Sequence, residues 1–132
     1  MTSACDVCHD SGVAATVLVV DDHPSFRRFA RRLLEAGGFT VVEEAEDGSS
    51  AIAAVRAFRP DVVLLDVLLP DTTGIELAEV LAAEPPAPLV VLTSSRSAAD
   101  LEPSLGRSSA RGYIAKRDLT AASFAALVGG AA

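Results

Sequence analysis

Polar residues that could do chemistry follow four of the short apolar runs in this sequence. They are, in chain order, Asp21 and Asp22, Asp66, Thr93 and Lys116. The run before Asp66, residues 62–65, is too short for a helix and is typical of a strand buried on both faces. The carboxyl ends of parallel strands lie at one edge of a sheet, where the ligand crevice forms. We therefore expect these side chains to share one crevice.

This combination of groups favours phosphoryl transfer with a divalent cation. Three clustered carboxylates repel one another, so at least one pKa rises unless cations intervene. Lys116 supplies one positive charge, and the remaining negative charge suits Mg²⁺, which prefers oxygen ligands and accepts phosphate oxygens. Asp66 could then act as the nucleophile and form an acyl phosphate. Lys116 and the Thr93 hydroxyl could stabilise the phosphoryl oxygens.

The elements that must position these groups alternate along the chain. The patterns predict strands at 16–20, 39–43, 61–65, 89–92 and 112–115, and helices at 24–36, 49–58, 73–83, 97–106 and 120–128. Five βα units predict an α/β fold with a doubly wound parallel sheet and helices on both faces. The strand at 39–43 becomes acidic and is expected at an edge of the sheet. Pro103 predicts a short or kinked fourth helix.

The first helix has an apolar face and a basic face. Its apolar residues recur at helical spacing: Phe26, Phe29, Ala30, Leu33 and Leu34. Its four arginines, Arg27, Arg28, Arg31 and Arg32, are expected on the outer, solvated face. Pro24 suits the first turn of this helix, and His23 is interpreted as a loop or cap residue rather than a ligand.

Composition and charge narrow the class of protein. The chain has 132 residues, half of them hydrophobic, and a net charge of −7. The charge argues against direct DNA binding and against a basic membrane surface. No apolar run approaches the ~20 residues of a membrane span, and the N-terminus lacks a signal peptide, so we expect a cytoplasmic protein. We expect one domain at 16–128, with a flexible N-terminal tail at 1–15 and a C-terminal tail at 129–132.

The segment Cys5-Asp6-Val7-Cys8-His9 contains the C-x-x-C-H pattern of covalent haem attachment. Haem attachment normally needs export, which nothing here indicates. A structural zinc ion would need four ligands, and only Cys5, Cys8 and His9 are nearby. We interpret the segment as part of the tail.

Together these residues resemble the receiver domain of two-component response regulators. The resemblance rests on Asp21-Asp22, on Asp66 within VLLDVLLPDTTG, on Thr93 within VVLTSS and on Lys116 within GYIAK, and it covers about residues 16–128. Each motif alone is weak, but all of them in this order are specific. The resemblance implies a CheY-like, flavodoxin-like (βα)₅ sheet with strand order 2-1-3-4-5.

The resemblance also implies roles for individual residues. Asp66 would accept a phosphoryl group from a sensor histidine kinase. Mg²⁺ would be bound by Asp22, Asp66 and the backbone carbonyl of Leu68, with help from Asp21. The switch pair would be Thr93, which moves toward the phosphoryl group, and Tyr113, which turns inward. Gly74 matches the loop glycine after the phosphorylation site.

Two features depart from the family pattern. Arg117 follows Lys116 where the family usually has proline, and Pro103 falls within the helix that usually signals. The segments Asp21-Asp22-His23-Pro24 and Lys116–Leu119 resemble the branch that usually carries a helix-turn-helix output domain. We expect a receiver domain that stands alone or is separated from its output domain. Its output partner is unknown, and phosphorylation could lead to a homodimer.

Two other functions remain open at this point. One is a phosphatase or phosphotransferase with an aspartyl nucleophile, although such enzymes place an acid two residues after the nucleophile, where this chain has Leu68. The other is a scaffold that works without phosphorylation, which the complete acidic set disfavours. We expect a signalling module that catalyses only its own phosphoryl transfer and autodephosphorylation, not a metabolic enzyme.

Overall fold

The computed structural model describes residues 15–95 and 109–129. Its five strands are β2 (Thr16–Val20), β3 (Thr40–Ala45), β4 (Val62–Asp66), β5 (Leu89–Ser94) and β6 (Gly112–Ala115). Its helices are α1 (Pro24–Ala36), α2 (Gly48–Phe58), α3 (Gly74–Ala82), the 3₁₀ turn η2 (Lys116–Asp118) and α5 (Ala121–Val128). The predicted helix at 97–106 with Pro103, most of both predicted tails and the Cys5–His9 segment lie outside the described residues.

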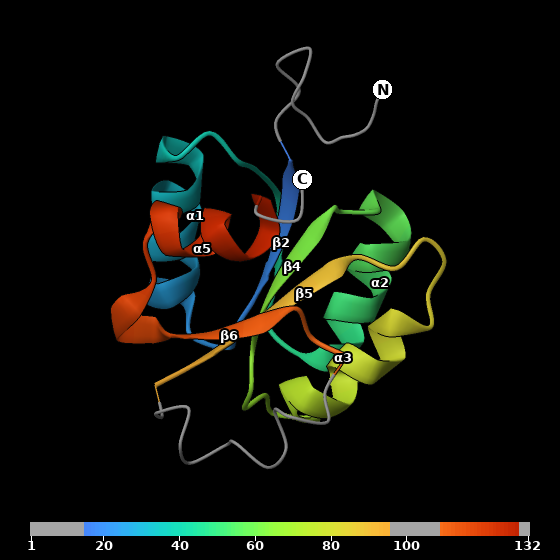
Figure 1. Cartoon of the computed structure of the whole chain (residues 1–132). Helices are drawn as coiled ribbons and strands as arrows, with labels where there is room; N and C mark the ends of the chain where they lie inside the picture. Colours follow the sequence, from blue (N-terminus) through green and yellow to red (C-terminus); the bar gives the residue numbers. More distant parts are fainter. Residues whose placement is uncertain (1–14, 96–108, 130–132) are drawn as a thin grey trace.

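All strand pairs in the sheet are parallel, and the strands lie in the order β3-β2-β4-β5-β6. In chain order this is 2-1-3-4-5, so the predicted α/β class and strand order are confirmed. Figure 1 shows α1 and α5 on one face of the sheet and α2 and α3 on the other. The predicted edge strand is confirmed as β3, although it runs to Ala45 rather than ending at Glu43.

The alternation of side chains along each strand divides the core into two layers. Val63 and Leu65 of β4 face the α2 and α3 layer, whereas Val62 and Leu64 face the α1 and α5 layer. All four side chains are buried, as the continuous apolar run predicts for a central strand covered on both faces. Asp66 is the last residue of β4 and pairs with Thr93 of β5, which places it at the carboxyl edge of the sheet.

The structure corrects the predicted faces of α1. Ala30 and Leu34 are buried, but Phe29 is largely exposed because it lies one residue, about 100° of helix turn, from Ala30. Arg27 and Arg31 are not simply solvated: both guanidinium groups pair with Glu44 of β3. The outer face therefore includes Arg28, Phe29 and Arg32, while two arginines join α1 to the edge strand.

No helix in the described ranges has both the length and the apolar character needed to cross a bilayer.

Candidate phosphorylation site

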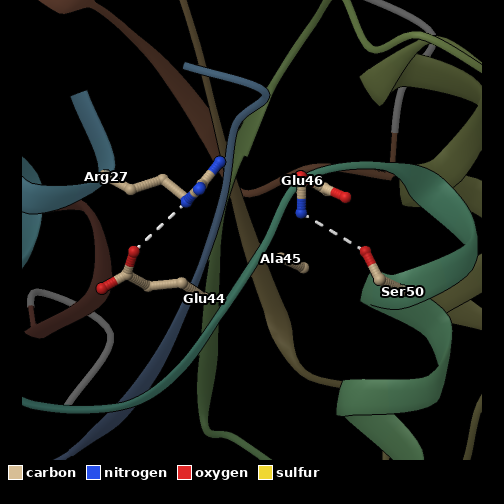
Figure 2. Close-up of a pocket in the computed structure, with 5 residues that line it drawn as sticks. All are labelled: Arg27, Glu44, Ala45, Glu46 and Ser50. Carbon is tan, nitrogen blue, oxygen red and sulfur yellow. Dashed lines mark hydrogen bonds and ion pairs between the residues drawn. The ribbon is translucent and has the colours of Figure 1, made fainter. Parts of the chain in front are cut away.

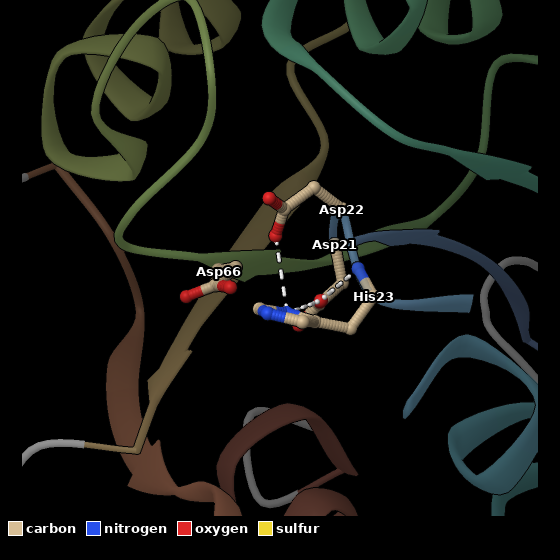
Figure 3. A group of neighbouring side chains, drawn as sticks. All are labelled: Asp21, Asp22, His23 and Asp66. Carbon is tan, nitrogen blue, oxygen red and sulfur yellow. Dashed lines mark hydrogen bonds and ion pairs between the residues drawn. The ribbon is translucent and has the colours of Figure 1, made fainter. Parts of the chain in front are cut away.

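The acidic residues meet at the carboxyl edge of the sheet, as the strand ends predict. Figure 3 shows Asp21, Asp22 and His23, at the end of β2, facing Asp66 at the end of β4. One ligand atom from each of these four side chains lies within 4.8 Å of the others. Asp21 has no exposed surface and Asp66 is 4% exposed, whereas Asp22 and His23 are open to solvent. Two carboxylates are thus buried in the floor of the site, and a third lies at its rim.

Lys116 provides the positive charge of the site. Its Nζ atom lies 2.7 Å from Asp21 Oδ2 and 3.4 Å from Asp66 Oδ2. The ammonium also lies 4.4 Å from the ring centroid of Phe26, which adds a cation–π contact. Lys116 enters through the 3₁₀ turn directly after β6, so its position follows from the place where that strand ends.

The two buried carboxyl groups have opposite pKa shifts. Burial and the neighbouring charge of Asp21 raise the pKa of Asp66 to about 6, against the charge of Lys116 and a hydrogen bond from the Leu68 amide. Burial also acts to raise the pKa of Asp21, but Lys116 and the two donors of His23 outweigh it and hold that pKa below its ordinary value. Asp21 is therefore the ionised partner of Lys116, whereas Asp66 is the carboxyl group that more readily binds a proton.

His23 is the N-cap residue of α1, as the sequence interpretation predicts, although its side chain makes no capping hydrogen bond. The His23 side chain lies beside the acidic cluster instead, a position that was not predicted from the sequence. Its backbone amide donates to Asp21 Oδ1 at 2.8 Å, and its Nδ1 lies 2.9 Å from Asp21 Oδ1 and 3.1 Å from Asp22 Oδ1. An aspartate followed two residues later by a donor is typical of an Asx turn, which was the available sequence signal.

Thr93 lies beside Asp66 on the neighbouring strand. The two residues are register partners in the β4–β5 pair, and the Val67 amide donates to the Thr93 carbonyl. The Thr93 hydroxyl is fully buried and has no hydrogen-bond partner among the described residues. A buried hydroxyl without a partner costs about 1–3 kcal/mol, so this position favours an oxygen-rich ligand beside Asp66.

Tyr113 is half-buried on β6 and packs against the α2 and α3 layer of the core. Its hydroxyl donates to the Ser94 carbonyl at 3.4 Å, one residue beyond Thr93. Tyr113 is thus hydrogen-bonded to the residue that follows Thr93. It lies on β6, at the edge of the sheet, and is not part of the acidic cluster.

The backbone after Asp66 is tightly folded. The Leu68 amide donates to Asp66 Oδ1 at 3.2 Å, and Leu68 pairs with Thr73 in an antiparallel bridge. A Cβ atom on Gly74 would clash with the Asp66 carbonyl oxygen and would lie 2.9 Å from Val67 Cα. Only glycine permits α3 to begin this close to Asp66, which is a physical reason for the Gly74 of the predicted motif.

A hollow of about 270 Å³ lies at the end of β3 and is lined by residues 44–46, by Arg27 of α1 and by Ser50 of α2. Figure 2 shows Arg27 and Glu44 on one wall and Glu46 and Ser50 on the other. No sequence-predicted site residue lines this hollow, but Arg27 connects it to the site, because its Nη1 donates to the Asp21 carbonyl at 2.6 Å. Sequence spacing did not identify this contact.

The donor set fits a hard divalent cation. Three carboxylates lie together with a single ammonium group, and burial, followed by the charge of Asp21, raises the pKa of Asp66 despite the nearby Lys116. Carboxylate oxygens are the ligands that Mg²⁺ prefers. The cluster can therefore hold a metal ion, with Asp22 as its most accessible carboxylate.

Comparison with known proteins agrees with this geometry. The response regulator receiver domain model matches residues 17–124. The chain is 41% identical over 100 residues to the DNA-binding response regulator MtrA of Mycolicibacterium smegmatis, covering 76% of this chain and 43% of MtrA. It is 39% identical over 84 residues to a protein-glutamate methylesterase/protein-glutamine glutaminase of Hahella chejuensis, covering 64% of this chain and 24% of that enzyme.

Among solved structures, a two-component response regulator of the LuxR family from Aurantimonas sp. superposes with a TM-score of 0.77 at 30% identity, covering 88% of this chain and 86% of that chain. The chain spans about a quarter to a half of the length of the curated relatives it matches. These matches do not favour the alternative of an aspartyl phosphatase. The chain belongs to the receiver domain family of two-component response regulators.

Proposed function

We propose that Asp66 is the phosphoryl acceptor of this receiver domain and that a sensor histidine kinase is the donor. The observation that carries the proposal is the buried Thr93 hydroxyl beside Asp66, which lacks a partner among the described residues. A phosphoryl group on Asp66 would supply the missing acceptor oxygen. Asp22 would remain in the aqueous rim, where a phosphodonor arrives.

The proposed step is an in-line displacement at phosphorus. An Asp66 carboxylate oxygen attacks and forms a new O–P bond, while the bond from phosphorus to the donor atom breaks. The donor atom, a histidine nitrogen of the kinase or an acyl oxygen of a small phosphodonor, leaves with the electron pair. Lys116, 3.4 Å from Asp66, is close enough to stabilise the charge on the transferred group.

The acceptor must be ionised to attack. Because its pKa is about 6, most Asp66 carboxyl groups are ionised at neutral pH, and a bound cation would lower the pKa further. We propose that Mg²⁺ is held by Asp22, Asp66 and the Leu68 carbonyl, with Asp21 assisting. When bound, the ion would neutralise charge on the phosphoryl oxygens.

The proposal extends to signalling. Movement of the Thr93 hydroxyl toward the phosphoryl group would be coupled to Tyr113, which changes the surface around β6 and thereby the affinity for an output protein or a second copy. MtrA is described as DNA-binding, and by analogy the output of this system would be transcriptional. The net charge of −7 argues against direct DNA contact by these residues. The kinase partner is implied by the family resemblance, and a cytoplasmic location remains part of the proposal.

The test is labelling with a small acyl phosphate in the presence and absence of Mg²⁺, followed by intact-mass measurement. We expect one phosphoryl group on the wild type with Mg²⁺, and none on Asp66→Asn. Equal labelling of the two proteins would exclude Asp66 as the acceptor. Sustained turnover of a generic phosphate ester would instead revive the aspartyl phosphatase alternative.

A further inference from the structure

The turn after Asp66 is joined to the start of α2. Asp71 lies in this turn, and its two carboxylate oxygens accept the backbone amides of Gly48 at 2.8 Å and Ser49 at 3.1 Å. These amides are in the first turn of α2, where no carbonyl within the helix can accept them. The N-terminal end of a helix also favours a negative charge. Asp71 therefore caps α2 from a different part of the chain.

The contact is close on both sides. A Cβ atom on Gly48 would lie 2.6 Å from the Thr72 Cγ2 methyl group and 3.3 Å from Asp71 Oδ1. Gly48 is buried, so the turn packs directly on the backbone of α2. A side chain at position 48 would push the turn away unless Thr72 became smaller.

The same turn carries the groups that contact the phosphoryl acceptor. The Leu69 amide donates to the Thr72 carbonyl at 3.2 Å, and the Leu68–Thr73 bridge closes the turn. These bonds make one small rigid unit, with Asp71 at one end and Leu68 at the other. The Leu68 amide in turn donates to Asp66. A short chain of bonded contacts thus runs from the α2 N-terminus to Asp66.

We propose that Asp71 is a positioning residue: by anchoring the turn on α2 it fixes the Leu68 amide and carbonyl relative to Asp66, and so sets cation affinity and phosphoryl acceptance. The inference rests on the proposed function of Asp66. Groups that orient metal ligands from outside the ligand set typically change metal affinity about 10–100-fold when removed. Nothing in the family motifs quoted above assigns this role to Asp71.

The matched control is Asp47. It caps the same helix by accepting the Ser50 amide at 2.8 Å, and it carries the same charge, but among the described residues its side chain forms hydrogen bonds with Ser50 and not with the turn. Asp47→Ala therefore weakens α2 and removes one negative charge without releasing Leu68. Asp71→Ala makes the same charge change and also releases the turn. Any effect of Asp71→Ala that exceeds the effect of Asp47→Ala can therefore be assigned to the position of the turn rather than to helix stability or charge.

The experiment measures Mg²⁺ affinity by calorimetry, acyl phosphate labelling rate at saturating Mg²⁺, and the Leu68 amide resonance without Mg²⁺. For Asp71→Ala and Gly48→Ala we expect roughly tenfold weaker Mg²⁺ binding and a shifted Leu68 resonance. For Asp47→Ala we expect a Mg²⁺ affinity and a Leu68 amide resonance close to those of the wild type. Gly48→Ala combined with Thr72→Ser, which removes the clashing methyl group, should recover most of the affinity.

Equal effects of Asp71→Ala and Asp47→Ala on affinity and on the Leu68 resonance would overturn the proposal, because both would then act through helix stability or charge. If Asp71→Ala unfolds, Asp71→Asn keeps one acceptor oxygen and should give an intermediate loss of affinity. If the wild type neither binds Mg²⁺ nor is labelled, the proposed function fails, and the Leu68 resonance still decides whether Asp71 positions the turn.

Discussion

The Lys116 ammonium lies 2.7 Å from Asp21 but 3.4 Å from Asp66. The shorter contact is an ion pair with the Asp21 carboxylate, which has no exposed surface. Lys116 therefore mainly neutralises the buried Asp21. Asp66 is stabilised less by the ammonium group, and burial together with the charge of Asp21 raises its pKa to about 6.

The first prediction concerns Lys116. Lys116→Met leaves two buried carboxylates without their ammonium partner, and breaking such a pair typically costs about 3–5 kcal/mol. We expect the free energy of unfolding without Mg²⁺ to fall by at least about 2 kcal/mol, because the site is open to solvent on one side. Urea denaturation at pH 7.5 with and without Mg²⁺ measures the loss.

Arg117→Met is the matched control for this change. Arg117 is the next residue, carries the same charge and is exposed, so its substitution should alter stability by less than about 0.5 kcal/mol. A similar loss in both variants would mean that net charge, rather than the buried pair, determines the effect.

The second prediction concerns the pH dependence that Asp66 imposes. Its pKa is raised from 3.8 to about 6, so the folded protein binds the proton more tightly than the unfolded chain. Ionisation of Asp66 therefore costs stability as the pH rises from about 4 through 6, and the cost is complete above about pH 7. One pKa unit corresponds to ~1.4 kcal/mol, so the full effect is at most about 3 kcal/mol.

Asp66→Asn removes this ionisation, and its free energy of unfolding relative to wild type should increase between pH 4 and pH 7. Urea denaturation across this range measures the difference. A carbon-13 titration of the Asp66 carboxyl group should give a midpoint near 6 without Mg²⁺ and a lower midpoint with it. A midpoint near 4 in the metal-free protein would contradict the assigned burial and charge.

The acidic cluster was predictable because each residue directly follows an apolar run. Strand period and burial fix where a strand ends, so Asp66 and Lys116 could be assigned to one edge from the sequence alone. The observed bounds of several strands differ from the predicted ones by one or two residues. In the β2–β3 pair a register shift also places one extra residue of β3 opposite the Val17–Leu18 step of β2, which the sequence pattern does not indicate.

The contacts that orient the site were not predictable in this way. Asp71 meets Gly48, 23 residues earlier, only because α2 and the turn after β4 approach closely in space. Helical spacing predicts that Arg27 lies on the solvated face of α1, away from the apolar residues. Its long side chain nevertheless reaches the end of β2. Such contacts depend on the tilt of helices against the sheet, which hydrophobic periodicity does not encode.

The third prediction concerns Arg27, whose guanidinium bonds the carbonyl oxygen of Asp21 at 2.6 Å and Glu44 at 3.2 Å. The Asp21 amide is held by the Ala45 carbonyl, so Arg27 supplies the second anchor of this residue. Arg27→Met leaves the Asp21 carbonyl without its donor. We expect a loss of about 1–3 kcal/mol of unfolding free energy, the typical cost of an unsatisfied partly buried group, and a shift of the His23 amide resonance. Arg27→Lys should recover part of the loss.

Arg28→Met provides the comparison, because Arg28 is exposed on the same helix and carries the same charge. It should change stability by less than about 0.5 kcal/mol and leave the His23 resonance in place. Glu44→Gln should lower stability and remove only the part of the Arg27→Met cost that comes from the Arg27–Glu44 ion pair, since the Asp21 carbonyl still loses its donor. Strict additivity of the two substitutions would show instead that Arg27 anchors Asp21 without help from the edge strand.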